Sequence, residues 1–341
     1  MSGSLASEEV VTALKAAAEP TRLRILLLLA AGELTVKDLT KILGQSQPRI
    51  SRHLKLLVAA GLVERFREGS WAYFRVSDRA KGGKLMLDIL ALVDAADPGV
   101  ERDRARAEGL RRDRETAAQI YFREHAADWD RIRSLHVAES EVEEAMSVAL
   151  GHGPFDLVVD LGTGTGRILE LFADRYERGL GFDMNQAMLA YARSKLSNLH
   201  LTRAQVRQGD IYSLALPDSV ADAVIMHQVL HFLSQPAHAI REAARVLAPG
   251  GRLLIVDFAP HELEFLRDEY AHDRLGFAPT QVAQWFRDAG LQPLEQRDLH
   301  PRTKGGREHL TVSLWLAACP DAVCAQPRSK RTPTPAVQEA S

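Results

Sequence analysis

The sequence predicts an α/β protein of two domains, a small N-terminal one and a larger one built on a mostly parallel, doubly wound sheet. Three observations predict this. The 341 residues are about twice an ordinary domain length. Apolar residues at helical spacing fill residues 8–60, and a β-hairpin pattern follows up to residue 76. From about residue 155 to 318, seven apolar β-type runs alternate with helical patterns.

The composition is that of an ordinary globular protein, with 46% hydrophobic and 26% charged residues, so both domains can bury a core. The net charge of −2 hides a basic segment, because residues 20–80 hold eleven Lys and Arg against five Asp and Glu. That segment can approach phosphate groups. Cys319 and Cys324 form neither a disulfide framework nor a zinc spacing. With no signal sequence and no apolar run long enough to span a bilayer, we expect a cytoplasmic protein without a membrane partner.

Three short helices are predicted in the N-terminal domain. Pro20 lies in the first turn of the first helix, and Gly32 ends it. The second helix begins at Thr35, whose side chain can form a reciprocal cap with Asp38 three residues later. Gly44 ends this second helix, and the third one begins close behind it.

The third helix carries apolar residues at helical spacing, and we expect Ile50, Leu54, Leu57 and Val58 to face inward. Polar side chains near its N-terminal half then face outward, where a recognition helix meets base edges. A hairpin with basic residues follows and can contact phosphate as a wing. Each arginine alone could be a solvated surface charge, but the joint pattern predicts binding to double-stranded DNA. The predicted DNA-binding residues are Gln45, Ser46, Gln47, Arg49, Ser51, Arg52, His53, Lys55, Arg65, Arg67 and Tyr73.

The stretches EPTRLRILLLL, SRHLKLLVAAGLV and WAYFRV closely resemble the ArsR/SmtB family of winged-helix repressors, over residues 8–96. The resemblance implies a winged helix-turn-helix domain that binds an operator as a homodimer. It also implies that the dimer forms through residues 10–17 and 85–93. Many members of that family sense metal through cysteines in an ELCVC-like stretch. Here residues 33–37 read ELTVK, so the thiolates are absent and we expect no metal site.

The connection between the domains is rich in charge of both signs. Residues 97–115 interleave Arg with Asp and Glu, which predicts a solvated helical linker rather than a nucleic-acid-binding arm. Residues 319–341 contain Pro, Ser, Thr, Lys and Arg without periodicity and predict a disordered tail. We therefore expect a DNA-binding and dimerisation domain at 1–96, this linker, a ligand-binding domain at 116–318 and the tail.

A glycine-rich loop, DLGTGTG at residues 160–166, follows an apolar strand and precedes a helix that begins near Arg167. The alternate glycines allow a tight turn and a close approach of the backbone to a ligand. Such a loop can serve a dinucleotide, a P-loop phosphate or S-adenosylmethionine. A P-loop is excluded because no Lys-Ser/Thr follows Gly166. Asp183, seventeen residues later, ends the second strand and suits the ribose of either remaining ligand.

Further features follow in order: Asp210 after the third strand, His227 at the end of the fourth, and the turn APGG before the fifth. Together DLGTGTG and VLAPGGRLLI closely resemble class I S-adenosylmethionine-dependent methyltransferases over about two hundred residues. The resemblance implies a Rossmann-like seven-stranded sheet that binds S-adenosyl-L-methionine or S-adenosyl-L-homocysteine. A segment from Tyr121 to Asp130 resembles the lid of small-molecule methyltransferases. The implied cofactor-binding residues are Asp160, Gly162, Gly164, Gly166, Asp183, Met184, Asp210, Ile211, His227, Gln228 and Tyr121.

Methyl transfer needs few catalytic side chains, because positioning supplies much of the acceleration. His227 and His231 are the candidates for a base, although the favoured interpretation of each is a structural or ligand-contacting imidazole. Two functions remain open, since both need the same pocket. The favoured one is a transcriptional regulator whose adenosyl ligand is an effector controlling methionine or methyl-cycle genes. The alternative is an active small-molecule methyltransferase with an autoregulatory DNA-binding head. No methyl acceptor is identified by the sequence.

Overall fold

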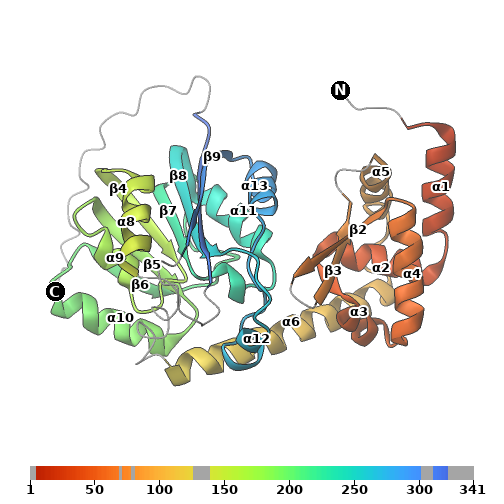
Figure 1. The fold of residues 1–341 in the computed structure, drawn as a ribbon, viewed down its shortest axis with the longest axis horizontal. Helices are drawn as coiled ribbons and strands as arrows, with labels where there is room; N and C mark the ends of the chain where they lie inside the picture. The colour runs from red at the N-terminus through yellow and green to blue at the C-terminus, as the bar shows by residue number, and fades with distance from the viewer. Residues whose placement is uncertain (1–4, 69–70, 78–80, 126–138, 301–309, 322–341) are drawn as a thin grey trace, which may run out of the picture.

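The computed structural model describes residues 5–68, 71–77, 81–125, 139–300 and 310–321. It shows a small head and a larger body, joined by one long helix along the bottom of the view in Figure 1. The head contains a three-stranded sheet of order β1-β3-β2. Its elements are α1 (Ser7–Ala17), α2 (Pro20–Ala31), β1 (Leu34–Thr35), α3 (Val36–Leu43), α4 (Gln47–Ala59), β2 (Val63–Glu68), β3 (Trp71–Val76) and α5 (Lys81–Leu90).

The structure confirms the helix starts and ends that the sequence predicts in the head. The Thr35 hydroxyl accepts from the Asp38 backbone N–H at 3.2 Å, and the Asp38 carboxylate accepts from the Thr35 N–H at 3.0 Å. Pro20 occupies the first turn of α2. Gly44 follows α3 with φ of 64°, the left-handed conformation that glycine adopts without strain. These caps fix where the short helices begin and end.

Helix α4 lies against the head core through one narrow face. Ile50, Leu54 and Leu57 are buried there, as predicted. Val58 was expected on the same face, but its side chain is 38% exposed, and that prediction is wrong. At one position beyond Leu57, it is rotated by about 100° around the helix axis, away from the core.

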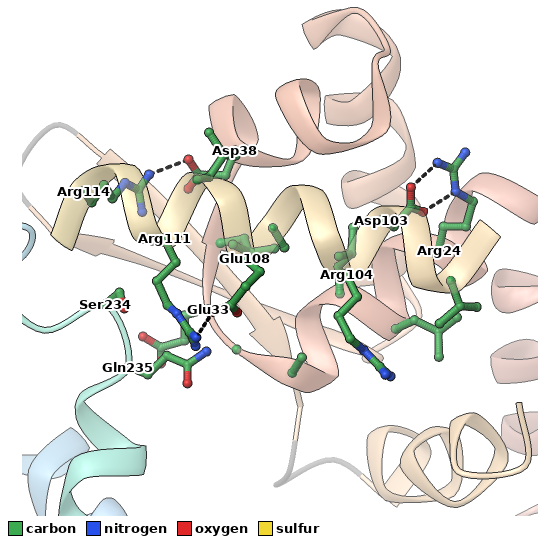
Figure 2. Close-up of a pocket in the computed structure, with 18 residues that line it drawn as sticks. Arg24, Glu33, Asp38, Asp103, Arg104, Glu108, Arg111, Arg114, Ser234 and Gln235 are labelled. Carbon is green, nitrogen blue, oxygen red and sulfur yellow. Dashed lines mark hydrogen bonds and ion pairs between the residues drawn. The ribbon is translucent and has the colours of Figure 1, made fainter. Parts of the chain in front are cut away.

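Helix α6 (Pro98–His125) crosses the predicted domain boundary at residue 115 without a break. One side of its N-terminal part is paired with the head, while Glu101, Arg104 and Asp113 are exposed, so the predicted linker is solvated on one face only. Figure 2 shows Arg24 of α2 bound bidentately to Asp103, and Arg114 bound to Asp38 of α3. Long helices that connect domains are solvated only where nothing packs on them. Here Asp103 is the acid that pairs with the head, whereas Glu108 pairs with Arg111 of the same helix.

The body contains a seven-stranded sheet of order β6-β5-β4-β7-β8-β10-β9, in which β10 runs in the direction opposite to the other six strands. All seven predicted strands are present. The strands are β4 (Phe155–Leu161), β5 (Tyr176–Asp183), β6 (Ala204–Gln208), β7 (Ala221–His227), β8 (Leu247–Phe258), β9 (Gln292–Leu299) and β10 (Val312–Ala318). The helices are α8 (Glu139–Leu150), α9 (Arg167–Leu171), α10 (Gln186–Asn198), η2 (Leu230–Phe232), α11 (Pro236–Val246), α12 (Phe265–Glu269) and α13 (Pro279–Asp288).

Helices cover both faces of this sheet. Helices α11 and α13 share one core cluster with the sheet, and α8 and α9 share the other. Strands buried on both faces need continuous apolar runs, which is why Val158, Val159, Val224 and Ile225 are all fully buried. The chain order reverses between β4 and β7, and open α/β sheets hold ligands at such a switch point. Within the part of the chain described here, no helix is long and apolar enough to cross a bilayer.

Candidate functional site

A cavity of about 310 Å³ lies at the carboxyl edge of the sheet, at this switch point. Its walls come from the loop after β4, the end of β5, the loop after β6 and the end of β7. Helix α6 closes one side, and the residues around η2 close another. Segments far apart in the sequence therefore meet at one pocket, as the parallel topology requires.

The glycine loop forms the floor of the pocket through two of its three glycines. Gly162 has φ of +73°, and a Cβ there would lie 2.4 Å from the Val229 Cγ2 atom. Gly164 also has positive φ, and its N–H donates to the Asp183 carboxylate at 2.9 Å. Gly166 does not line the pocket. A Cβ on it would lie 3.3 Å from Ala192, so its role in the structure is close packing of the loop on α10.

Asp183 is the carboxylate at the centre of this wall. It accepts from the Gly164 N–H and, at 2.8 Å, from the Asn185 N–H. Burial raises the pKa of Asp183 above its usual value, while these backbone hydrogen bonds lower it. Asn185 caps α10, and its side-chain amide donates to the Gln119 carbonyl of α6 at 3.0 Å. The carboxylate and helix α6 are thus held by the same turn.

Eight of the eleven predicted cofactor-binding residues line the pocket, which leaves three elsewhere. The eight are Gly162, Gly164, Asp183, Met184, Asp210, Ile211, His227 and Gln228. Besides Gly166, the exceptions are Asp160, which is 1% exposed beneath the loop, and Tyr121. Burial, with Tyr270 nearby, raises the pKa of Tyr121 to about 12, so its phenol is neutral. The rest of the predicted lid, residues 126–130, lies outside the described residues.

The two candidate bases have different surroundings. His227 lines the pocket at the end of β7. His231 is 2% exposed and is not among the pocket-lining residues; its Nδ1 atom lies 2.8 Å from the Asp257 carboxylate. Only His227 can therefore touch a reacting group in this structure, and His231 has a structural position.

Sequence reasoning predicted Tyr121 at the pocket but missed the residues of α6 that line it. Glu108, Arg111, Gln119 and Phe122 all line it. The Phe122 ring also packs edge-on against Phe232, with the ring centres 4.7 Å apart. The pair Tyr121-Phe122 in an amphipathic helix was the available signal, but only the fold shows that Phe122 faces the ligand side.

The predicted recognition helix presents a polar and basic face. Gln47, Arg49, Arg52, Lys55 and Ser46 are exposed, and Ser51 is partly exposed. Gln45 is also partly buried, and its amide donates to the Thr21 hydroxyl at 3.3 Å. Burial lowers the pKa of His53; neighbouring arginines lower it further, against the opposing effect of Glu19.

Of the three DNA contacts predicted in the wing, the structure contradicts one, that of Tyr73. Arg65 is exposed on β2, and Arg67 lies in the same strand, although its side chain is outside the described part. Tyr73 was predicted to contact DNA, but it is only 1% exposed. Its hydroxyl donates to the Asp273 carbonyl at 3.3 Å, so the side chain is covered by the larger body. In this conformation Tyr73 cannot reach DNA.

A helical head with a wing, joined to a doubly wound sheet with a glycine loop at its switch point, defines a winged-helix protein fused to a methyltransferase fold. Comparisons agree with both halves. The family described as bacterial regulatory protein, arsR family, matches residues 19–65, and that described as methyltransferase domain matches residues 159–255. The chain thus combines an ArsR-type regulatory head with a class I methyltransferase domain.

Individual relatives each cover one part of the chain. An arsenical resistance operon repressor of Escherichia coli K12 is 52% identical over 64 residues, 18% of this chain and 55% of that protein. A probable S-adenosylmethionine-dependent methyltransferase of Mycolicibacterium smegmatis is 30% identical over 156 residues, 41% of this chain and 59% of that protein. The chain therefore spans little more than half the length of these curated relatives.

One solved structure supports the fold of the body alone. A putative methyltransferase of Haloferax volcanii, solved with the Trm112 methyltransferase activator, has a TM-score of 0.50 at 22% identity. The match covers 58% of this chain and 97% of that one.

Proposed function

We propose that this protein is a DNA-binding transcriptional regulator whose methyltransferase domain binds S-adenosyl-L-methionine or S-adenosyl-L-homocysteine as an effector. We propose further that it acts in the cytoplasm on methionine or methyl-cycle genes. One observation carries this proposal: α6 is a single helix that pairs with the head through Asp103 and Arg114 and lines the pocket through Gln119 and Phe122. A ligand in the pocket therefore contacts the helix that supports the DNA-reading head.

The pocket suits an adenosyl ligand. In this proposal the Asp183 carboxylate accepts from the ribose hydroxyls, and Asp210 accepts from the adenine amino group. Gly162 and Gly164 present backbone without a side chain to the amino-acid part of the ligand, and a Cβ at Gly162 would lie 2.4 Å from the Val229 Cγ2 atom, which also belongs to the pocket wall. The matched mycobacterial relative carries the same cofactor in its name, which supports this assignment.

The raised pKa of Asp183 predicts a pH dependence of ligand affinity. Only the ionised carboxylate can accept from both ribose hydroxyls, so affinity is full above its pKa and falls as pH drops through it. Because burial raises that pKa, the loss begins at a higher pH than for an ordinary aspartate. Calorimetric titration between about pH 8 and pH 5 checks this. Asp183→Asn has no such carboxyl, and a wild-type slope that persists in this variant contradicts the assignment.

The head binds DNA, in this proposal, as a homodimer with one α4 in each major groove of a palindromic operator. Val11 and Leu14 on α1 are 46% and 44% exposed, which supports a second copy covering this face. Arg52→Ala is expected to weaken operator binding by about 1–3 kcal/mol. Electrophoretic mobility shifts measure this, with Arg287→Ala, an exposed arginine on α13, as the matched control. Equal affinities of the two variants would contradict the placement of α4.

Effector function is tested by titrating an operator with the protein alone and with each adenosyl ligand. A ligand changes DNA affinity only if it binds the DNA-competent and incompetent states differently. We expect the operator dissociation constant to change by about 5-fold or more with at least one of the ligands. Identical titrations in all three conditions would reject the effector role.

The alternative function is methyl transfer to a small molecule. The observation in its favour is that His227 lies on the pocket wall. A base there can remove a proton from an acceptor. This alternative predicts that label from S-adenosyl-[methyl-³H]methionine moves to small molecules of a cell extract. The transfer should fail with His227→Ala, while operator affinity stays independent of the adenosyl ligand.

A further inference from the structure

A short segment of the methyltransferase domain, Tyr270–Arg274, lies against the wing of the head. We refer to this segment as the latch. Its Arg274 side chain is 2% exposed. The guanidinium lies 3.0 Å from the Glu33 carboxylate and 4.4 Å from the centre of the Tyr73 ring. An arginine buried between a carboxylate and an aromatic face has one well-defined position.

A second set of contacts holds the same segment to the head. The Asp273 carbonyl accepts hydrogen bonds from the Tyr73 hydroxyl and from Arg267. Arg267 itself lies 4.4 Å from the centre of the Trp71 ring. The Asp273 carboxylate is 3.7 Å from Arg114 of α6. Both aromatic residues on this face of β3 are therefore in contact with arginines of the methyltransferase domain.

The other side of the latch is bonded to the wall of the cofactor pocket. The backbone N–H groups of Asp273 and Arg274 both donate to the His231 carbonyl, at 2.9 and 3.0 Å. His231 is fixed by Asp257, and its neighbour Phe232 lines the pocket. The latch is thus hydrogen-bonded to His231, and the next residue in the chain, Phe232, has its side chain on the pocket wall.

The two domains are not in close contact everywhere. A cavity of about 160 Å³ lies between α2, α6 and the turn at Ser234 and Gln235. Figure 2 shows the side chains that line it. A movement of one cavity wall has little effect on the opposite wall, because the lining atoms have no contact partner across the empty space. The bonded path through His231, Asp273 and Tyr73 crosses between the domains outside this cavity, and it reaches the wing in addition to the link along α6.

We propose that the latch is a conformational lock that couples the cofactor pocket to the wing, with the Arg274–Glu33 pair as its central contact. The inference rests on the proposed function and adds its mechanism. A ligand in the pocket immobilises η2, which holds the latch and keeps Trp71 and Tyr73 covered. Without ligand, η2 and the latch loosen, and the wing gains freedom to move relative to the methyltransferase domain.

The test removes the central ion pair without leaving a buried charge. A single substitution would strand the partner charge and risk unfolding, so both are neutralised in Glu33→Gln/Arg274→Met. The matched control is Glu143→Gln/Arg167→Met, an ion pair within the methyltransferase domain at 2.6 Å. Hydrogen exchange of the β3 amides is measured for the three full-length proteins with and without S-adenosylhomocysteine, and calorimetry confirms ligand binding. Operator affinity is then measured in both conditions.

In wild type and control we expect the ligand to slow exchange in β3. In Glu33→Gln/Arg274→Met, β3 should exchange faster without ligand, the ligand should no longer slow it, and ligand affinity should stay within about threefold. The operator response to ligand should be lost only in this variant. Exchange in β3 that is equal in wild type and variant, or a ligand effect that the variant keeps, overturns the latch. If β3 responds while operator affinity is constant in wild type, the latch stands and the effector function fails.

Discussion

Asp183→Ala should weaken binding of S-adenosylmethionine or S-adenosylhomocysteine by about 1–3 kcal/mol, or roughly 5- to 150-fold in the dissociation constant. The carboxylate sits on the pocket wall, where it is fixed by the N–H groups of Gly164 and Asn185. In the proposed binding mode, its loss removes the charged acceptor for the ribose hydroxyls. Isothermal titration calorimetry measures the change directly.

The matched control for this prediction is Asp174→Ala. The Asp174 side chain is 85% exposed, so this variant removes the same charge from the domain without touching the pocket. Its ligand affinity should equal that of wild type. If Asp183→Ala binds as tightly as this control, the ribose of the ligand lies elsewhere and the proposed pocket is wrong.

Local structure was predictable from the sequence because its signals are local. The reciprocal cap of Thr35 and Asp38 and the helix stop at Gly44 need only neighbours within four residues. The central strands of the methyltransferase domain were predictable as well, since strands buried on both faces leave continuous apolar runs, whereas the edge strands β6 and β9 are mostly exposed. Val58 shows the limit, because the edge of an apolar helix face is set by the neighbouring elements.

The site was predictable where its residues end strands. Asp183, Asp210 and His227 line the pocket because parallel strands bring their carboxyl ends to one edge. The contribution of α6 was not, since charge interleaving looks the same in a solvated helix and in one paired with a domain. The burial of Tyr73 depends on Asp273, two hundred residues later in the chain, and no local pattern records that contact.

Gly162→Ala is expected to cost both stability and ligand binding. The backbone φ of +73° strains any residue with a Cβ by about 1–2 kcal/mol. A Cβ there would also lie 2.4 Å from Val229 Cγ2, so Val229 or the loop must move, at a further cost of about 1–3 kcal/mol. Both residues line the pocket, and the movement therefore reshapes the ligand site.

Thermal unfolding and calorimetry separate these two costs when Gly290→Ala is the control. Gly290 has a similar φ of +77°, and a Cβ there would meet no atom within 4 Å. The control should lose about 1–2 kcal/mol of stability from strain alone and keep its ligand affinity. Gly162→Ala should lose more stability and bind the ligand at least about tenfold more weakly, because displacing Val229 or the loop changes the pocket wall that the ligand contacts. Equal ligand affinity in the two variants would mean that the glycine loop tolerates a side chain, and the close approach of backbone to ligand would not be needed.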